Sequence, residues 1–126
     1  MDLARIRREF AEAERTFALV ELRSTADGNP YVRTALQTGN KKQYVLSIHF
    51  PGTYPYEMPT VYIDAPEIGY APHRYDAGNL CYLHKAMWNP GAHHLTFVIA
   101  RVAKWLNKYE VWQNNGGVWP GAEVQH

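Results

Sequence analysis

The segment FPGTYPYEMPTVYI, residues 50–63, decides how the rest of the chain can fold. Prolines recur through it and beyond it, at Pro51, Pro55, Pro59, Pro66 and Pro72. Proline lacks an amide donor and clashes with the preceding helical turn, so this stretch excludes a regular helix. The run TVYID, residues 60–64, begins near the end of this segment and is short enough for an edge strand. The other strands are therefore expected before it, and a loop after it.

Three segments before the proline-rich stretch have the pattern of β-strands. They are FALVELRS (17–24), YVRTALQT (31–38) and QYVLSIHF (43–50), separated by turn residues at 27–30 and 39–40. In the last of them, apolar side chains at every second position would point to one face of a sheet. Together with residues 60–64, these runs predict a four-stranded antiparallel meander.

An amphipathic helix is predicted at the N-terminus, with Asp2 as its N-cap. Its apolar residues recur three or four positions apart, at Leu3, Ile6, Phe10, Ala13 and Phe17. The opposite face is charged, with Arg5, Arg8, Glu9, Glu12 and Arg15. We expect the charged face to be solvated and the apolar face to cover the sheet.

The C-terminal half begins with a long irregular loop, expected from about 65 to 93. A loop of this length in a compact domain is usually functional. LTFVIARVAKWLNKYEVW, 95–112, carries one apolar stripe and predicts a long helix. Residues 113–126 form a tail with turns, in which Trp119 is expected to fold back onto the body. The chain is predicted to be a single α+β domain, 1–126, with its core in 1–112.

Composition narrows the class of protein. The chain has 126 residues, of which 46% are hydrophobic and 20% charged, as in ordinary globular domains. The formal net charge of +1 does not favour nucleic acid as a partner. No apolar run approaches the roughly 18 residues of a membrane span. A single cysteine cannot form an internal disulfide, which fits a cytoplasmic protein.

The only cysteine, Cys81, lies in YAPHRYDAGNLCYLH, residues 70–84. A lone cysteine often only packs in a core, but a loop rich in glycine and proline could present the thiol at the surface. A metal site with His84 is weakly supported, because structural zinc sites normally use two or more thiolates. The signature of a papain-like nucleophile is absent. The residues themselves leave packing, metal binding and nucleophilic chemistry open, and we expect no metal.

Two motifs stand in a fixed order around this loop. The first, at 50–63, contains Phe50, Pro51, Tyr54, Pro55, Pro59 and Val61. The second, PHRYDAGNLCYLHKAMWNP at 72–90, contains Pro72, Gly78, Leu80, Cys81, Trp88 and Pro90. Together they resemble the Phe-Pro-x-x-Tyr-Pro and Gly-x-x-Cys patterns of the ubiquitin-conjugating enzyme (UBC) family. The resemblance covers about residues 1–110 and implies a UBC fold in which Cys81 is the catalytic cysteine.

The chain departs from the family pattern at three places. The His-Pro-Asn triplet of the family is Ala71-Pro72-His73, the two C-terminal helices are missing, and the acidic residue near the cysteine cannot be located. Asp76, Glu110 and the tail are candidates for that acidic residue, and no spacing distinguishes them. These departures resemble the compact bacterial relatives found in antiphage (CBASS-like) and ubiquitin-like modification operons. Some of those relatives work with a cGAS-like nucleotidyltransferase.

The resemblance implies an acyl carrier that uses no cofactor. Cys81 would accept a protein C-terminus as a thioester and pass it to an amine. His73 would replace the asparagine, either as a donor to the oxyanion or as a strut of the loop. Supporting roles near the thiol are expected for Asp76, Tyr82, His84 and His94. The alternative is a catalytically inactive UBC-fold module that binds a ubiquitin-like partner.

Partner surfaces follow from the resemblance by position. The first helix would dock the adenylating (activating) enzyme through Arg5, Arg8 and Arg15. Tyr56 and the turn at Pro90 match places where ligases or other partners bind. The remaining partners implied are a ubiquitin-like modifier or a nucleotidyltransferase C-terminus, and a target lysine.

Overall fold

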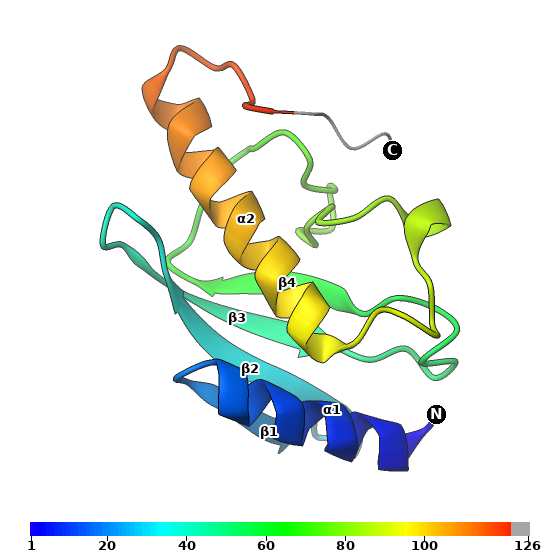
Figure 1. Ribbon diagram of the computed structural model, residues 1–126. Coiled ribbons are helices and arrows are strands. Elements are labelled where there is room, and N and C mark those ends of the chain that lie inside the picture. The colour runs from blue at the N-terminus through cyan, green and yellow to red at the C-terminus, as the bar shows by residue number, and fades with distance from the viewer. Residues whose placement is uncertain (122–126) are drawn as a thin grey trace.

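The computed structural model describes residues 1–121 (Figure 1). Its elements are helix α1 (Leu3–Thr16), strands β1 (Val20–Ser24), β2 (Pro30–Gln37), β3 (Gln43–His49) and β4 (Thr60–Ala65), a short 3-10 helix η1 (Lys85–Met87) and helix α2 (Leu95–Asn114). All neighbouring strands are antiparallel in the order β1-β2-β3-β4. The predicted four-stranded meander is confirmed. Helix α2 runs to Asn114, so the tail begins later than the expected residue 113.

The core lies between the sheet and α2. On β3, Tyr44, Leu46 and Ile48 are buried as the alternation predicts, but Ser47 is buried as well and its hydroxyl donates to Asp64. The apolar stripe of α2 packs into the same core. In Figure 1, α2 runs across β3 and β4, whereas α1 contacts β1 and α2. Helix α1 therefore packs on the sheet at β1, whereas α2 covers β3 and β4, which corrects the expectation that the first helix alone covers this face.

The sequence predicted that the charged face of α1 is solvated, and the structure corrects this at Glu9. Glu9 is only 2% exposed, whereas Leu3 is 52% exposed. The Glu9 carboxylate accepts hydrogen bonds from the Tyr54 hydroxyl (2.6 Å) and from the Leu95 amide (2.7 Å), and it pairs with Arg5. A buried carboxylate is tolerated when its oxygens are satisfied in this way. Glu9 thus joins α1, the proline-rich segment and the first turn of α2.

A second buried carboxylate, Glu110, holds the other end of α2 to the sheet. It accepts hydrogen bonds from the Tyr44 hydroxyl (2.7 Å) and the Asn40 side-chain amide (2.9 Å) on the β2–β3 hairpin. Burial opposes its ionisation, but these bonds and one with Thr38 outweigh burial and hold the pKa of Glu110 below its ordinary value. Since Glu110 serves this anchor, it is not free to assist an acceptor amine.

Replacing Glu110 with glutamine is expected to weaken the fold in a pH-dependent way. Loss of the charge-assisted bonds should lower the free energy of unfolding by about 1.5–3 kcal/mol at pH 7. Because the pKa of Glu110 is lower in the folded protein than in the unfolded chain, its ionised carboxylate stabilises the fold fully at pH values above the ordinary pKa of 4.5. This contribution is lost as the pH falls through the lower pKa of the folded state. The difference in the free energy of unfolding between wild type and Glu110→Gln should therefore become smaller below about pH 4.5. Urea unfolding from pH 7 to pH 3 measures it, with the exposed Glu14→Gln as control. A difference that stays constant with pH would contradict this account.

None of the helices in residues 1–121 has the length and apolarity that crossing a membrane requires.

Candidate active site

The loop that carries Cys81 is tied to the edge of the sheet. The Leu80 amide donates to the Val61 carbonyl of β4 (2.9 Å), and the Cys81 amide donates to the His73 carbonyl (2.9 Å). Between His73 and Cys81 the chain reverses at Gly78, whose φ of 96° lies in the left-handed region that glycine adopts without strain. Residues 73–81 therefore form a small hairpin beside β4, and the position of the thiol is set by backbone hydrogen bonds.

The Cys81 side chain is buried, which corrects the expectation that the loop presents it at the surface. It is 2% exposed, and its Sγ lies 4.0 Å from the Leu83 carbonyl oxygen. The sulfur faces a cavity of only about 20 Å³, which it shares with His73, Arg101 and other residues of α2 and the tail. A cavity of this size has room for about one water molecule. A protein thioester cannot form in it without movement.

The C-terminal tail provides the cover over this cavity. Positive φ values at Gly116 and Gly117 turn the chain back after α2. The Trp119 ring then lies 5.0 Å from the His73 ring and 5.4 Å from the Trp105 ring, measured between centroids. Trp119 also lines the cavity of Cys81. The prediction that Trp119 folds back is confirmed, and the tail meets the body at the thiol.

Burial favours the neutral form of the Cys81 thiol. Burial raises the pKa of the Cys81 thiol, while a hydrogen bond with Tyr75 and the charge of Arg101 act in the opposite direction without outweighing burial. The bond to Cys81, together with burial, raises the pKa of Tyr75 to about 12. Since the thiolate is the nucleophile, this closed arrangement is poorly reactive near neutral pH.

Sequence reasoning missed Tyr75 and Arg101 as neighbours of the thiol. Arg101 lies on α2, where its Nε donates to the Tyr82 carbonyl (3.0 Å). Tyr75 lies within the second motif, but at a position that the family pattern does not specify, and the 73–81 hairpin brings it to the thiol. Arg101 lies outside both motifs, and only the packing of α2 against the cysteine loop could identify it.

His73 lies beside the thiol with an unusual backbone. Its φ is 57°, in the left-handed region where asparagine, aspartate and histidine are enriched among non-glycine residues. Its carbonyl accepts hydrogen bonds from the Cys81 amide and from Trp105 Nε1 (2.9 Å). A histidine can thus adopt the left-handed backbone conformation at this position, as asparagine also can.

The other predicted supporting residues are not gathered around the sulfur. Tyr82 lines the cavity, but its hydroxyl donates to the Pro59 carbonyl at 2.5 Å. His84 caps η1, and its Nδ1 accepts from the Ala86 amide. His94 is the N-cap residue of α2, and its Nδ1 lies 3.4 Å from a carboxylate oxygen of Glu12. Asp76 lies in an exposed turn outside the cavity. The structure therefore brings only His73 and Tyr82 of the predicted set to Cys81.

Three of the predicted partner residues come together at one end of the molecule. Arg5 of α1, Tyr56 and Pro90 line one surface hollow of about 550 Å³, although they lie far apart in the sequence. Tyr56 is 79% exposed, which excludes a packing role in the core. Arg8 and Arg15 are exposed on α1, outside this hollow.

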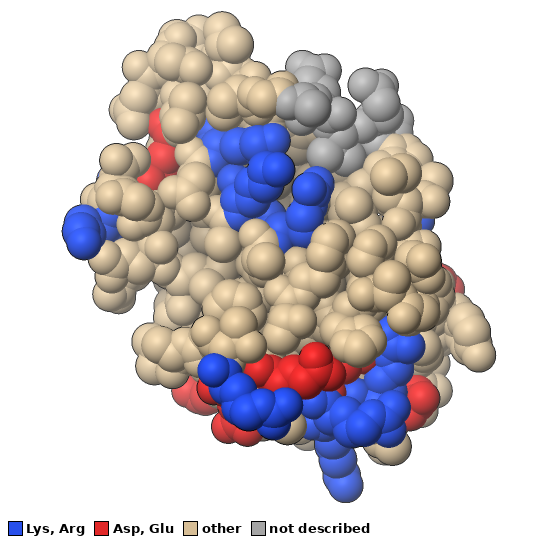
Figure 2. All heavy atoms as spheres, in the orientation of Figure 1, with Lys and Arg blue, Asp and Glu red and all other residues tan. Residues whose placement is uncertain are grey.

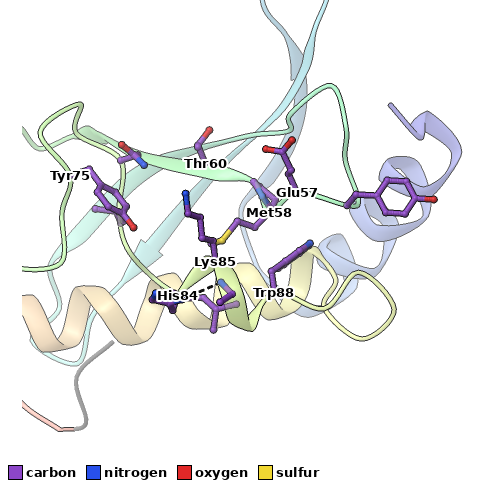
Figure 3. Close-up of a pocket in the computed structure, with 13 residues that line it drawn as sticks. Glu57, Met58, Thr60, Tyr75, His84, Lys85 and Trp88 are labelled. Carbon is purple, nitrogen blue, oxygen red and sulfur yellow. Dashed lines mark hydrogen bonds between the residues drawn. The ribbon is translucent and has the colours of Figure 1, made fainter. Parts of the chain in front are cut away.

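A larger cavity, about 760 Å³, lies between residues 56–60 and residues 83–88 (Figure 3). Figure 3 shows Lys85 projecting into it from η1, near Met58. Tyr75 forms part of its wall, but Cys81 does not. Tyr75 thus stands between this cavity and the thiol to which it is hydrogen-bonded.

No group of three or more histidine, cysteine, aspartate or glutamate side chains within residues 1–121 is placed to hold a metal ion. In particular, His84 lines the larger cavity and Cys81 the small one, so the two side chains are not gathered at one site.

The helix, the meander, the cysteine loop and the crossing helix together define the UBC fold. Solved structures share it: a ubiquitin-conjugating enzyme E2 from Plasmodium falciparum matches with a TM-score of 0.61 and 20% identity, over 82% of this chain and 96% of that one. Human ubiquitin-conjugating enzyme E2 G1 matches with a TM-score of 0.57 and 21% identity, over 80% and 90%. The Vps23 UEV, in a complex with ubiquitin, matches with a TM-score of 0.50 and 14% identity, over 86% and 97%. At these identities the likeness is one of fold.

The sequence itself identifies the family within this fold class. No curated protein sequence matches the chain. The pattern of the Type II CBASS E2 protein family matches residues 9–126, so the chain belongs to that family. This confirms the resemblance to a compact, CBASS-type UBC-fold protein and supports a function like that of ubiquitin-conjugating enzymes.

Proposed function

We propose that Cys81 accepts the C-terminal carboxyl group of a protein as a thioester and transfers it to an amine. The donor is a ubiquitin-like protein or a cGAS-like nucleotidyltransferase, and the setting is antiphage defence in the bacterial cytoplasm. The observation that carries the proposal is the position of Cys81. It is the family's cysteine by motif spacing, and it lies on a loop hydrogen-bonded to β4 with His73, Tyr75 and Arg101 around it.

The first step is thioester exchange. An adenylating enzyme delivers the donor as a thioester, and the Cys81 thiolate attacks its carbonyl carbon. The tetrahedral oxyanion collapses, the bond between carbon and the donor sulfur breaks, and the departing thiolate takes up a proton. Because one thioester replaces another, the step needs no strong base on the sulfur. The absence of a cysteine–histidine pair therefore does not weigh against it.

The second step is aminolysis. A neutral lysine amine of the target attacks the Cys81 thioester carbon, the bond between carbon and sulfur breaks as the amide bond forms, and the proton lost by the amine nitrogen is taken up by the departing Cys81 thiolate. A donor aimed at the developing oxyanion accelerates such a step. His73 is the residue proposed for this role, because it lies in the cavity of Cys81 and an imidazole N–H can donate.

The activating enzyme and the target must reach a thiol that is covered. We propose that the activating enzyme docks at the α1 end, where Arg5, Tyr56 and Pro90 line a common hollow and Arg8 and Arg15 are exposed. Displacement of the tail around Trp119 then opens the cavity.

Non-reducing gels test the proposal with the activating enzyme and donor encoded beside the gene. Wild type should form an adduct that thiols cleave, Cys81→Ser an adduct that they do not cleave, and Cys81→Lys a stable amide. A matched control is Cys81→Ser combined with Ser24→Cys, which moves the only thiol to the exposed end of β1 and should form no thioester. If wild type forms no thiol-sensitive adduct, the proposed enzyme function is wrong.

The second candidate is a UBC-fold module that binds a ubiquitin-like partner without chemistry. The burial of Cys81 and the altered Ala71-Pro72-His73 triplet favour it, and the structurally similar Vps23 UEV forms a complex with ubiquitin. The presence of the cysteine at the family position favours the enzyme. If the gels show no covalent adduct, but a pull-down shows that the donor binds both wild type and Cys81→Ser, the protein is a binding module and not an enzyme.

A further inference from the structure

Three cations of α2 form a basic face next to Cys81. Arg101, Lys104 and Lys108 follow one another at intervals of three and four residues, so they lie on one side of the helix. All three line the small cavity that contains Cys81 and His73. Figure 2 shows Lys and Arg side chains gathered over the middle of α2, surrounded mainly by uncharged atoms. We call Arg101, Lys104 and Lys108 the basic face.

The basic face has no acidic partner among residues 1–121. Arg5 and Arg23, elsewhere in the molecule, each pair with a neighbouring glutamate. Arg101 bonds only a carbonyl oxygen, and neither lysine takes part in an ion pair with a described residue. Burial, and then the charges of Lys104 and Arg101, lower the pKa of Lys108. Three like charges are thus crowded together, and binding an anion would relieve their repulsion.

We propose that the basic face binds acidic residues in the segment that precedes the acyl-donating C-terminus. This rests on the proposed function, since a thioester on Cys81 places the last residues of the donor at this cavity. Cys81 lines this cavity and not the larger one. From Arg101 to Lys108 the helix rises about 10 Å, which an extended peptide spans in about three residues. The acidic positions therefore lie a few residues before the donor C-terminus.

Other occupants fit these charges less well. The acceptor lysine approaches as a cation, which the basic face repels until it loses its proton. Nucleic acid is usually bound by a longer basic surface on a protein with a large positive charge, whereas this chain carries a net charge of +1. An acidic peptide matches both the short length of the basic face and its sign.

The test uses two synthetic peptides that end in a glycine thioester of mercaptoethanesulfonate. One carries glutamates at the third to sixth positions before the C-terminus, and the other carries glutamines there. At low salt we expect Cys81 to be acylated about tenfold faster by the glutamate peptide, as judged by intact mass. The advantage should vanish at high salt and in the double variant Lys104→Glu/Lys108→Glu. The matched control Arg7→Glu/Lys41→Glu changes the net charge equally at exposed sites away from Cys81 and should retain the advantage.

Equal acylation by the two peptides would overturn the proposal while leaving Cys81 as an acyl acceptor, so the proposed function would stand. If neither peptide acylates Cys81, an NMR titration of the ¹⁵N-labelled protein with the glutamate peptide lacking its thioester decides. Amide shifts at residues 101–108 that the Lys104→Glu/Lys108→Glu variant abolishes support the basic face. Shifts elsewhere, no shifts, or stronger shifts with a short DNA duplex overturn it. The gel assay with the activating enzyme then tests, independently of these peptides, whether Cys81 forms a thioester.

Discussion

Replacing Trp119 with alanine should raise the rate at which iodoacetamide alkylates Cys81 by about 30-fold. The Trp119 ring contacts His73 and Trp105 and lines the cavity of the buried thiol. Losing roughly 2 kcal/mol of apolar burial would raise the population of the open tail by that factor, because 1.4 kcal/mol corresponds to tenfold. The thiol reacts only when the tail opens, so the alkylation rate follows this population.

Mass spectrometry of the alkylated protein over time gives the rate. Tyr70→Ala removes an aromatic ring that is 81% exposed and outside the cavity, so it should leave the rate unchanged. Thermal unfolding of both variants shows whether alkylation reports local opening or loss of the whole fold. If Trp119→Ala is alkylated at the wild-type rate while remaining folded, the tail does not limit access to Cys81.

Replacing His73 with alanine should slow transfer from Cys81 to an amine by about 100-fold, while loading of Cys81 is retained. Removing one donor to an oxyanion typically has an effect of this size. Loading is an exchange between thioesters, so we expect it to depend less on this donor. Single-turnover discharge of the preformed thioester to free lysine measures transfer, and the rate of adduct formation measures loading.

The backbone of His73 requires a particular control. With φ at 57°, alanine introduces strain at this position, whereas asparagine tolerates the left-handed region. The carbonyl bonds to Cys81 and Trp105 remain available in every variant, because they use the main chain. His73→Asn should therefore keep the loop intact and restore transfer. If transfer survives in His73→Ala, the histidine is a strut; if Asn restores stability but not transfer, the imidazole itself is needed.

The sequence predicted the elements that depend on local patterns. Alternation in 43–50, the prolines at 51–72 and the helical stripe in 95–112 led to the observed strands and to α2. The spacing of the two motifs led to the UBC fold and to the family, which its sequence pattern confirms over residues 9–126. Such features follow from periodicity and from single residues with restricted backbones, so they can be read without knowing what packs against them.

Burial was harder to predict at two positions. Glu9 was assigned to a solvated face, yet it is buried because Tyr54 and Leu95 from other segments donate to its carboxylate, which also pairs with Arg5 one turn earlier on α1. Cys81 was assigned to an accessible loop, yet the tail and α2 enclose it. Helical periodicity indicates which side of a helix is polar, but it carries no information about which distant donors will meet that side.

The sequence alone therefore determined the order of the elements, the family resemblance and the identity of Cys81 and His73 as the residues of interest. Only the tertiary structure decided that Tyr75, Arg101 and Trp119 surround the thiol, and that the cations of α2 lie beside it. The physical reason is that the crossing of α2 over the sheet brings Arg101, Lys104 and Lys108 to the thiol, and the reversal of the chain at Gly116 and Gly117 brings Trp119 there. Contacts between segments this far apart depend on the packing of the whole core, which no local pattern encodes.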